Sequence, residues 1–147
     1  QMVQPDLHII PIILGGMDEN TLFEISSAIR EIIDDETLII ISSDFIHYGA
    51  SFGYEPFTTD IEKNIQALDM TAVKHIQNLD RRGFEAFIEE RQPTICGREQ
   101  IRLLLTLLSE SSEGILLDYR TSAQMNLDWS HSVSYVAMAF RGKWRKR

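Results

Sequence analysis

Two short apolar runs on either side of a stretch with helical spacing constrain the fold most strongly. Residues 8–14 and 37–43 consist mainly of isoleucine, leucine and other apolar residues, and a glycine pair ends the first run. Short, continuous apolar runs are typical of strands that are covered on both faces in a parallel sheet, while Pro11 places the first strand at an edge or a bulge. Because helical spacing separates the two runs, the sequence predicts a strand, a helix and a second strand joined by a right-handed crossover.

Helices and strands are also expected along the rest of the chain. The patterns predict helices from about residue 18 to 33, 59 to 77, 80 to 92 and 98 to 110, and strands over 114–124 and 132–141. Asp18, or Thr21 together with Glu24, is placed to cap the first helix. Thr59 with Glu62 is placed to cap the second.

The stretch from residue 44 to residue 57 contains glycine, proline and several aromatic residues without any period. It is predicted to be a long loop at the carboxyl end of the second apolar run, where open α/β sheets bind their ligands. Neither an internal repeat nor a linker divides the sequence. We therefore expect one domain of the α/β class over residues 1–147.

Charge is distributed unevenly along the 147 residues. The formal net charge is −8, and five of the 14 lysines and arginines lie in the last seven positions. The rest of the chain is strongly acidic and repels phosphate backbones, which argues against nucleic acid as a partner. The basic tail is predicted to be a solvated terminus rather than an interaction arm.

The cysteine content and the hydropathy bear on the compartment. A single cysteine rules out an internal disulfide framework, and the lack of a C-x-x-C pair argues against a structural zinc site. No apolar run reaches the roughly 18 residues that a membrane span needs, and the first residues lack the basic-then-apolar order of a signal peptide. The sequence therefore predicts a cytoplasmic protein without membrane contact.

An acid and a histidine, Asp44 and His47, stand three residues apart directly after the second apolar run. A carboxylate can orient an imidazole and raise its basicity by accepting its second N–H, and imidazole serves both proton transfer and metal binding. This pattern makes both residues candidate catalytic groups. The alternative is structural, with Asp44 capping a turn and His47 packed among Tyr48, Phe52 and Tyr54. The spacing leaves both interpretations open.

Cys96 precedes Gly97, which is placed to cap a helix that begins at Arg98. The positive end of a helix dipole and a nearby guanidinium both favour the thiolate, which can act as a nucleophile or a metal ligand. The alternative is a buried, inert cysteine. The chemistry of the residues does not decide between them.

The other three histidines give weaker signals. His8 lies within the first apolar run and His75 lies late in a predicted helix, so both are expected to be core or surface residues. His131 comes just before the last predicted strand, where a loop could reach the same rim as His47. We keep a place in the pocket as an open alternative for His131.

Three motifs occur in order along the chain: Ser-Ser-Asp-Phe-Ile-His-Tyr-Gly at 42–49, Thr-Ile-Cys-Gly-Arg at 94–98 and Ser-Val-Ser-Tyr at 132–135. With these motifs the sequence resembles the Memo-like proteins, also known in prokaryotes as protein B of the AmmeMemoRadiSam system. The opening run 9–15 and the acidic, aromatic segment after Gly49 match as well. The resemblance therefore spans nearly the whole chain.

The resemblance implies a fold similar to that of class III extradiol ring-cleaving dioxygenases. We expect a three-layer α/β arrangement, with a mostly parallel mixed sheet covered by helices and a pocket that holds a metal between histidines. Family members usually carry an N-terminal half with two metal-binding histidines and a Ser-x-Glu-x-Gln-type segment, and this sequence begins just after that point. The N-terminal portion is thus expected to be missing, which leaves the C-terminal part of a Memo-like protein with an incomplete metal site.

The resemblance also implies roles for the motif residues. Cys96 and His47 are expected to be metal ligands, and Asp44 to lie in the same pocket. A thiolate with an imidazole suits iron, copper or zinc. If the chain is catalytic, the metal binds oxygen or substrate, His47 transfers protons and Asp44 orients His47. None of the histidines replaces the missing ligands by motif.

The function that the resemblance implies is a metal-dependent redox or oxygen-using enzyme with a small-molecule substrate. The alternative is a non-catalytic adaptor, which binds a phosphopeptide or other acidic peptide, or accompanies AMMECR-type and radical-SAM proteins. Phosphopeptide recognition needs converging arginines, and Arg98 is the only arginine within the motifs, which favours the enzyme. A third interpretation is a metal-free structural remnant.

Overall fold

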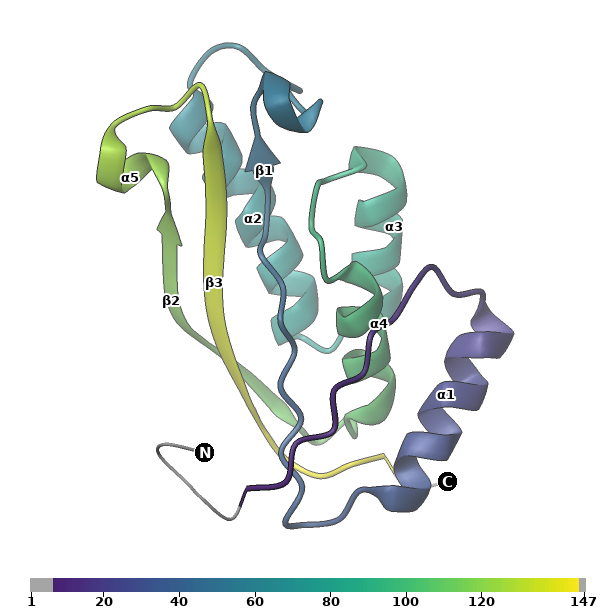
Figure 1. Cartoon of the computed structure of the whole chain (residues 1–147). Coiled ribbons are helices and arrows are strands. Elements are labelled where there is room, and N and C mark those ends of the chain that lie inside the picture. The colour runs from purple at the N-terminus through teal and green to yellow at the C-terminus, as the bar shows by residue number, and fades with distance from the viewer. Residues whose placement is uncertain (1–6, 146–147) are drawn as a thin grey trace.

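The helices lie close to the positions that the helical periodicity of the sequence predicted. The computed structural model describes residues 7–145; residues 1–6 and the last two residues of the basic tail lie outside the described residues. In chain order the elements are α1 (Glu19–Ile32), β1 (His47–Tyr48), the 3-10 helix η1 (Ala50–Phe52), α2 (Ile61–Gln77), α3 (Arg81–Arg91), α4 (Arg98–Leu107), β2 (Glu113–Thr121), α5 (Ala123–Asn126) and β3 (Ser132–Arg141). Figure 1 shows α2, α3 and α4 grouped beside β2 and β3. The four longer helices and the last two strands confirm the predicted elements.

The helix starts show which caps form. Asp18 accepts a hydrogen bond from the backbone N–H of Thr21, which settles the cap of α1. The capping box predicted from Thr59 is wrong, because Asp60 takes the cap position of α2 in a left-handed conformation without a side-chain cap. Among the described residues, no helix combines the length and the apolar character required to cross a membrane.

The sheet has the strand order β1-β3-β2, and both strand pairs are antiparallel. The long β2–β3 hairpin is paired from Glu113 opposite Arg141 to Thr121 opposite Ser134, with an irregularity in register near Asp118. The mostly parallel sheet that we predicted is therefore wrong for the described strands. The chain has a hairpin where parallel pairing would need a crossover.

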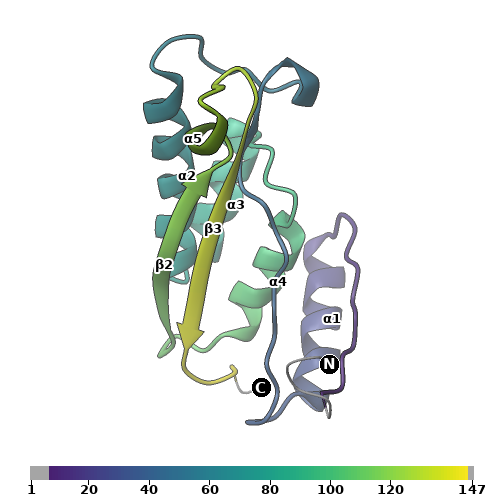
Figure 2. The same ribbon diagram turned by 60° about the vertical axis from the view of Figure 1, so that its left-hand side comes forward.

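The predicted strand, helix, strand unit forms only its helix. Residues 7–18 and 33–46 contain no strand, and Ile13 is 95% exposed and Ile40 79% exposed. Figures 1 and 2 show the segment that leads to β1 running as a single trace between β3 and α4. An apolar run predicts burial, but a strand also needs a partner for its backbone groups, and residues 7–145 provide none here. We call residues 7–42 the arm and residues 43–145 the body.

The main core lies between the helices and one face of the hairpin. The buried core residues include Ala72, Val73, Ile76, Phe84, Phe87, Ile101 and Leu105, and Leu116, Val136, Met138 and Phe140 of the hairpin pack against them. The other face of the hairpin exposes Ile115, Leu117 and Tyr135. The described residues therefore cover one face of the sheet, and the second helical layer that the three-layer expectation requires is not formed by them.

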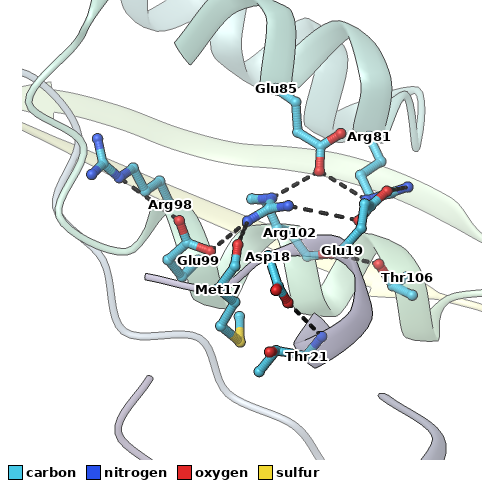
Figure 3. A network of polar contacts seen from close by, with 10 residues as sticks. All are labelled: Met17, Asp18, Glu19, Thr21, Arg81, Glu85, Arg98, Glu99, Arg102 and Thr106. Atoms are coloured by element: carbon cyan, nitrogen blue, oxygen red, sulfur yellow. Dashed lines mark hydrogen bonds and ion pairs between the residues drawn. The ribbon is translucent and has the colours of Figure 1, made fainter. Parts of the chain in front are cut away.

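The arm attaches to α4 through a small apolar cluster and a group of charges. Leu22 packs with Leu103 and Leu107. Figure 3 shows the charged group, which we call the clamp and which comprises Glu19, Arg81, Glu85, Glu99 and Arg102. Arg102 from α4 bonds Glu85 at 2.8 Å and Glu99 at 2.7 Å, while Arg81 from α3 bonds Glu19 of α1 at 2.7 Å. The hydrogen bond from Arg81 lowers the pKa of Glu19.

Candidate functional site

The segment that enters β1 lies against the loop between α3 and α4 and pairs with the start of β3, so all three motifs meet. The backbone N–H of His47 donates to the hydroxyl of Thr94 at 2.8 Å, and that hydroxyl donates to the carbonyl of His47 at 2.8 Å. The other end of the segment is fixed too, because the N–H of Gly97 donates to the Ser43 hydroxyl at 2.9 Å. Residues 43–47 and 94–97 therefore form one local structure, although about 50 positions separate them in sequence.

The imidazole of His47 is fixed through one of its two nitrogens. Nδ1 lies 2.7 Å from the carbonyl oxygen of Thr94. Because a carbonyl only accepts, Nδ1 must carry the proton, which leaves the lone pair of a neutral ring on Nε2. Nε2 lies 3.8 Å from Oδ2 of Asp44. Thr94 therefore makes the orienting contact that we expected from Asp44, and Asp44 lies where it would stabilise a protonated ring.

Cys96 is exposed and contacts the same segment. Its Sγ accepts a hydrogen bond from the backbone N–H of Asp44 at 3.2 Å. Gly97 occupies the cap position of α4 and the helix begins at Arg98, as predicted. The guanidinium of Arg98 lies 4.0 Å from the carboxylate of Glu99. The structure thus brings Cys96 to the same loops as Asp44 and His47, and the alternative of a buried cysteine is wrong.

Two glycines permit the close approach of the loops. A Cβ at Gly97 would lie 2.3 Å from the Cβ of Ser43, closer than van der Waals contact allows. Gly49 has a φ of 129°, and a Cβ there would lie 2.4 Å from the carbonyl oxygen of Ser130. Both motifs therefore need glycine beside the candidate site for steric reasons.

His131 lies near His47, with the ring of Phe52 between them. Its ring stacks on Phe52 with centroids 4.6 Å apart, and the other neighbour of Phe52 is the ring of His47 at 5.1 Å. Nδ1 of His131 lies 2.9 Å from the hydroxyl of Ser51. His47 is thus both a candidate chemical group and part of an aromatic cluster.

The remaining histidines lie elsewhere, as expected. His8 is exposed in the arm. His75 is on α2, where its Nδ1 lies 2.8 Å from the carboxylate of Asp80. Sequence reasoning missed the part played by Thr94, although Thr94 stands in a motif, and it missed Asp69, whose signal was a carboxylate on the otherwise apolar face of α2.

A cavity between the arm and the body does not include the three candidate residues. A cavity of about 580 Å³ lies between residues 37–41 of the arm, α4 and β3. Its wall includes Ser43 and Phe45 but not Asp44, His47 or Cys96. We base the candidate site on the motif residues, because hydrogen bonds between the two motifs fix their positions.

The donor types present would suit a metal, but the described residues do not complete a site. Cys96 offers a thiolate, His47 an imidazole and Asp44 a carboxylate, and each of these groups can bind a metal. Yet no group of three or more histidine, cysteine, aspartate or glutamate side chains within residues 7–145 is arranged to hold a metal ion. The site is open, since the side chain of Asp44 is 48% exposed.

Comparison with known proteins identifies the relatives of the chain. A family model described as "Memo-like protein" matches residues 1–139. A "MEMO1 family protein" of Thermococcus onnurineus is 28% identical over 149 residues, which cover 96% of this chain and 51% of the relative. "Protein MEMO1" of Xenopus laevis is 33% identical over 144 residues, which cover 91% of this chain and 48% of the relative. The chain spans about half the length of the curated relatives it matches.

Proposed function

The chain belongs to the Memo-like protein family, and from this premise we propose that it supplies one wall of a metal site in a metal-dependent redox or oxygen-using enzyme related to class III extradiol dioxygenases. The observation that supports the proposal is the meeting of Cys96 with Asp44 and His47 across two motifs. The proposed substrate is a small molecule that enters from the open side of this wall.

The ligand chemistry supports a transition metal. A soft thiolate with an imidazole suits copper(I), iron or zinc. Catalytic metal sites usually have three protein ligands, and we propose that those which Cys96 and His47 do not supply come from outside the described residues. The coverage of only half of each relative is consistent with this proposal.

The side chains of the wall divide the work. The carbonyl of Thr94 keeps the proton of His47 on Nδ1, so Nε2 is free to take a proton from a substrate or to bind the metal. The carboxylate of Asp44 lies 3.8 Å from Nε2, on the same side of the wall. A bound metal would supply a Lewis-acidic or redox centre.

Cobalt(II) binding tests this proposal, because a cobalt–thiolate bond gives a charge-transfer absorption. The chain is titrated with cobalt(II) and compared with Cys96→Ser, His47→Ala and His8→Ala. We expect weak binding, because Cys96 and His47 alone leave the site incomplete, with thiolate absorption that Cys96→Ser abolishes and His47→Ala weakens. His8→Ala is the matched control, because His8 is exposed in the arm. Equal cobalt binding by the wild type and Cys96→Ser would contradict the proposed site.

A second candidate function is partner binding without catalysis. The exposed apolar side chains of the arm, among them Ile13 and Ile40, favour it. A phosphopeptide needs converging arginines, whereas Arg98 stands beside Glu99. The proposed partner is therefore an AMMECR-type or radical-SAM protein. Co-elution of the chain with such a partner tests this function. Loss of co-elution in a double variant, Ile13→Asp and Ile40→Asp, together with unchanged co-elution of Cys96→Ser, would support partner binding over the enzyme.

Fold and location complete the proposal. We propose that the three-layer arrangement forms when additional chain covers the open face of the hairpin, which exposes Leu117 and Tyr135. We also propose a cytoplasmic location, where the single cysteine stays reduced, and no nucleic-acid partner, because the net charge is −8.

A further inference from the structure

The only fully buried charged residue among residues 7–145 is Asp69, in the middle of α2. Its neighbours on the same face of the helix are apolar, namely Ile65, Ala72, Val73 and Ile76. Burying a carboxyl group is costly unless its oxygens are hydrogen-bonded, so this position needs specific partners. A leucine would satisfy the apolar surroundings at lower cost.

Both oxygens of Asp69 have partners, and these come from different elements. Oδ1 accepts a hydrogen bond from the backbone N–H of Ile46 at 3.2 Å. Oδ2 accepts one from the hydroxyl of Tyr119 on β2 at 2.8 Å. Burial raises the pKa of Asp69, and burial together with the charge of Asp69 raises the pKa of Tyr119. The carboxyl group thus ties α2, β2 and the entry to β1 together.

The peptide that Asp69 holds lies at the centre of the candidate site. The N–H of Phe45 donates to the carbonyl of Ser134 at 2.9 Å, and the N–H of Ser134 donates to the carbonyl of Ile46 at 2.9 Å. Phe45 and Ile46 are therefore anchored to β3 and α2 and buried in the body. Asp44 and His47 directly flank this anchored pair, so any shift of the pair displaces both of them.

We propose that Asp69 is a positioning residue of the candidate site: through the Ile46 N–H it fixes the backbone that holds His47 against Thr94 and Asp44 against Cys96. This inference rests on the proposed function, because it concerns the geometry of the same metal-binding wall. Asp69 touches neither metal nor substrate. Its effect reaches the site only through the Ile46 peptide, and Tyr119 supports it from the other side.

Two measurements test the positioning role. The first is the hydrogen-exchange rate of the Ile46 amide, and the second is the affinity for cobalt(II). Asp69→Leu removes both hydrogen bonds, and we expect faster exchange at Ile46 and about tenfold weaker cobalt binding, the size of effect that a lost buried hydrogen bond gives. Asp69→Asn keeps an acceptor, and we expect it to restore cobalt affinity to within about threefold of the wild type.

A matched control separates positioning from lost stability. Leu107→Ala lowers stability in the small apolar cluster under the arm, away from Asp69. We expect it to leave the Ile46 exchange rate, relative to other α2 and β3 amides, and the cobalt affinity unchanged. If Asp69→Leu does not fold, Tyr119→Phe takes its place, because it removes only the bond to Oδ2 and should accelerate Ile46 exchange to a smaller degree.

The outcomes decide the inference separately from the proposed function. Wild-type cobalt affinity and wild-type Ile46 exchange in Asp69→Leu, or in Tyr119→Phe where that variant replaces it, would overturn the positioning role. A Leu107→Ala variant that loses cobalt affinity as strongly as Asp69→Leu would also overturn it. If the wild-type chain binds cobalt too weakly to measure, as an incomplete site allows, the exchange rate of Ile46 alone decides whether Asp69 fixes this peptide.

Discussion

The arm and the body contain similar apolar sequences but have different structures. In the body, β3 finds a partner in β2, and the side chains on its inner face pack against α2, α3 and α4. In the arm, residues 8–14 and 37–42 are as apolar as β3 but form no strand, and Ile13 and Ile40 are exposed. The difference shows that apolar side chains alone do not make a strand, because the backbone also needs a hydrogen-bonding partner.

The two regions also differ in how they are held. The body depends on buried apolar area, whereas the arm depends on a small cluster around Leu22 and on the clamp between α1, α3 and α4. Exposed ion pairs contribute little free energy, while buried apolar side chains contribute much more. We therefore expect the arm to open before the body unfolds.

The largest expected effect comes from replacing an isoleucine by alanine, once in the body and once in the arm. Ile65→Ala removes a fully buried side chain from the body, and should lower the free energy of unfolding by about 2–5 kcal/mol. Ile13→Ala removes a side chain that is 95% exposed in the arm, and should change it by less than about 0.5 kcal/mol. Urea unfolding followed by circular dichroism measures both, and equal losses would contradict the contrast.

The clamp gives the next largest effect. Arg102→Ala removes the ion pair with Glu19 of α1 at 3.7 Å and the hydrogen bond to the carbonyl of Met17 at 3.0 Å, and should cost about 1–3 kcal/mol in the local stability of α1. Hydrogen exchange should show loss of protection in α1 but not in α2. Arg120→Ala is the matched control, because Arg120 is mostly exposed beside Asp118 and should cost about 0–0.5 kcal/mol. Equal loss of protection in α1 and α2 would show that arm and body unfold together.

The same contrast explains what could be predicted from the sequence. Helices depend on contacts within a few residues, so the spacing that predicted residues 98–110 and 80–92 gave α4 and α3 with small errors at their ends. The hairpin strands also followed from local pattern, and residues 132–141 agree with β3. Whether residues 8–14 and 37–43 form strands depends on a partner strand, and no local pattern contains that information.

The candidate site was predictable only in its residue types. The motifs indicated His47 and Cys96, and chemistry gave each of them possible roles. The contact of His47 with Thr94 could not be predicted, because it arises from the packing of two loops about 50 positions apart. The burial of Asp69 had a signal, a carboxylate on an apolar helix face, but its partners Ile46 and Tyr119 appear only in the folded chain.

A glycine in each region sharpens the contrast at the site. Gly97→Ala would bring its Cβ against Ser43 and should cost about 1–3 kcal/mol, with faster alkylation of Cys96 as the Asp44 contact loosens. Gly15→Ala in the arm meets no atom within 4 Å and should cost nothing measurable. Thermal unfolding and the alkylation rate measure the two effects. Alkylation unchanged in Gly97→Ala would mean that the two loops do not depend on this close approach.

The last comparison concerns how the stability that two carboxyl groups contribute changes with pH. The change is expected to have opposite signs for Glu19 and Asp69. The pKa of Glu19 in the arm is lowered, chiefly by its hydrogen bond with Arg81, so the stability it adds is present above its unfolded pKa of about 4.3 and is lost as the pH falls through the folded value. Because Glu19 is 63% exposed, this contribution should stay below about 0.5 kcal/mol. Burial raises the pKa of Asp69, so its contribution is present below the unfolded pKa of about 3.9 and is lost as the pH rises through the folded value.

Unfolding free energies of the wild type, Glu19→Gln and Asp69→Asn between pH 3 and pH 7 would show both signs. The destabilisation by Glu19→Gln should grow as the pH rises, because the wild-type carboxylate then pairs with Arg81. Asp69→Asn should instead gain stability relative to the wild type as the pH rises, because the asparagine keeps its place uncharged while the wild type must ionise a buried group. Slopes of the same sign would mean that Asp69 is solvated in solution, and that the body around the site is as open as the arm.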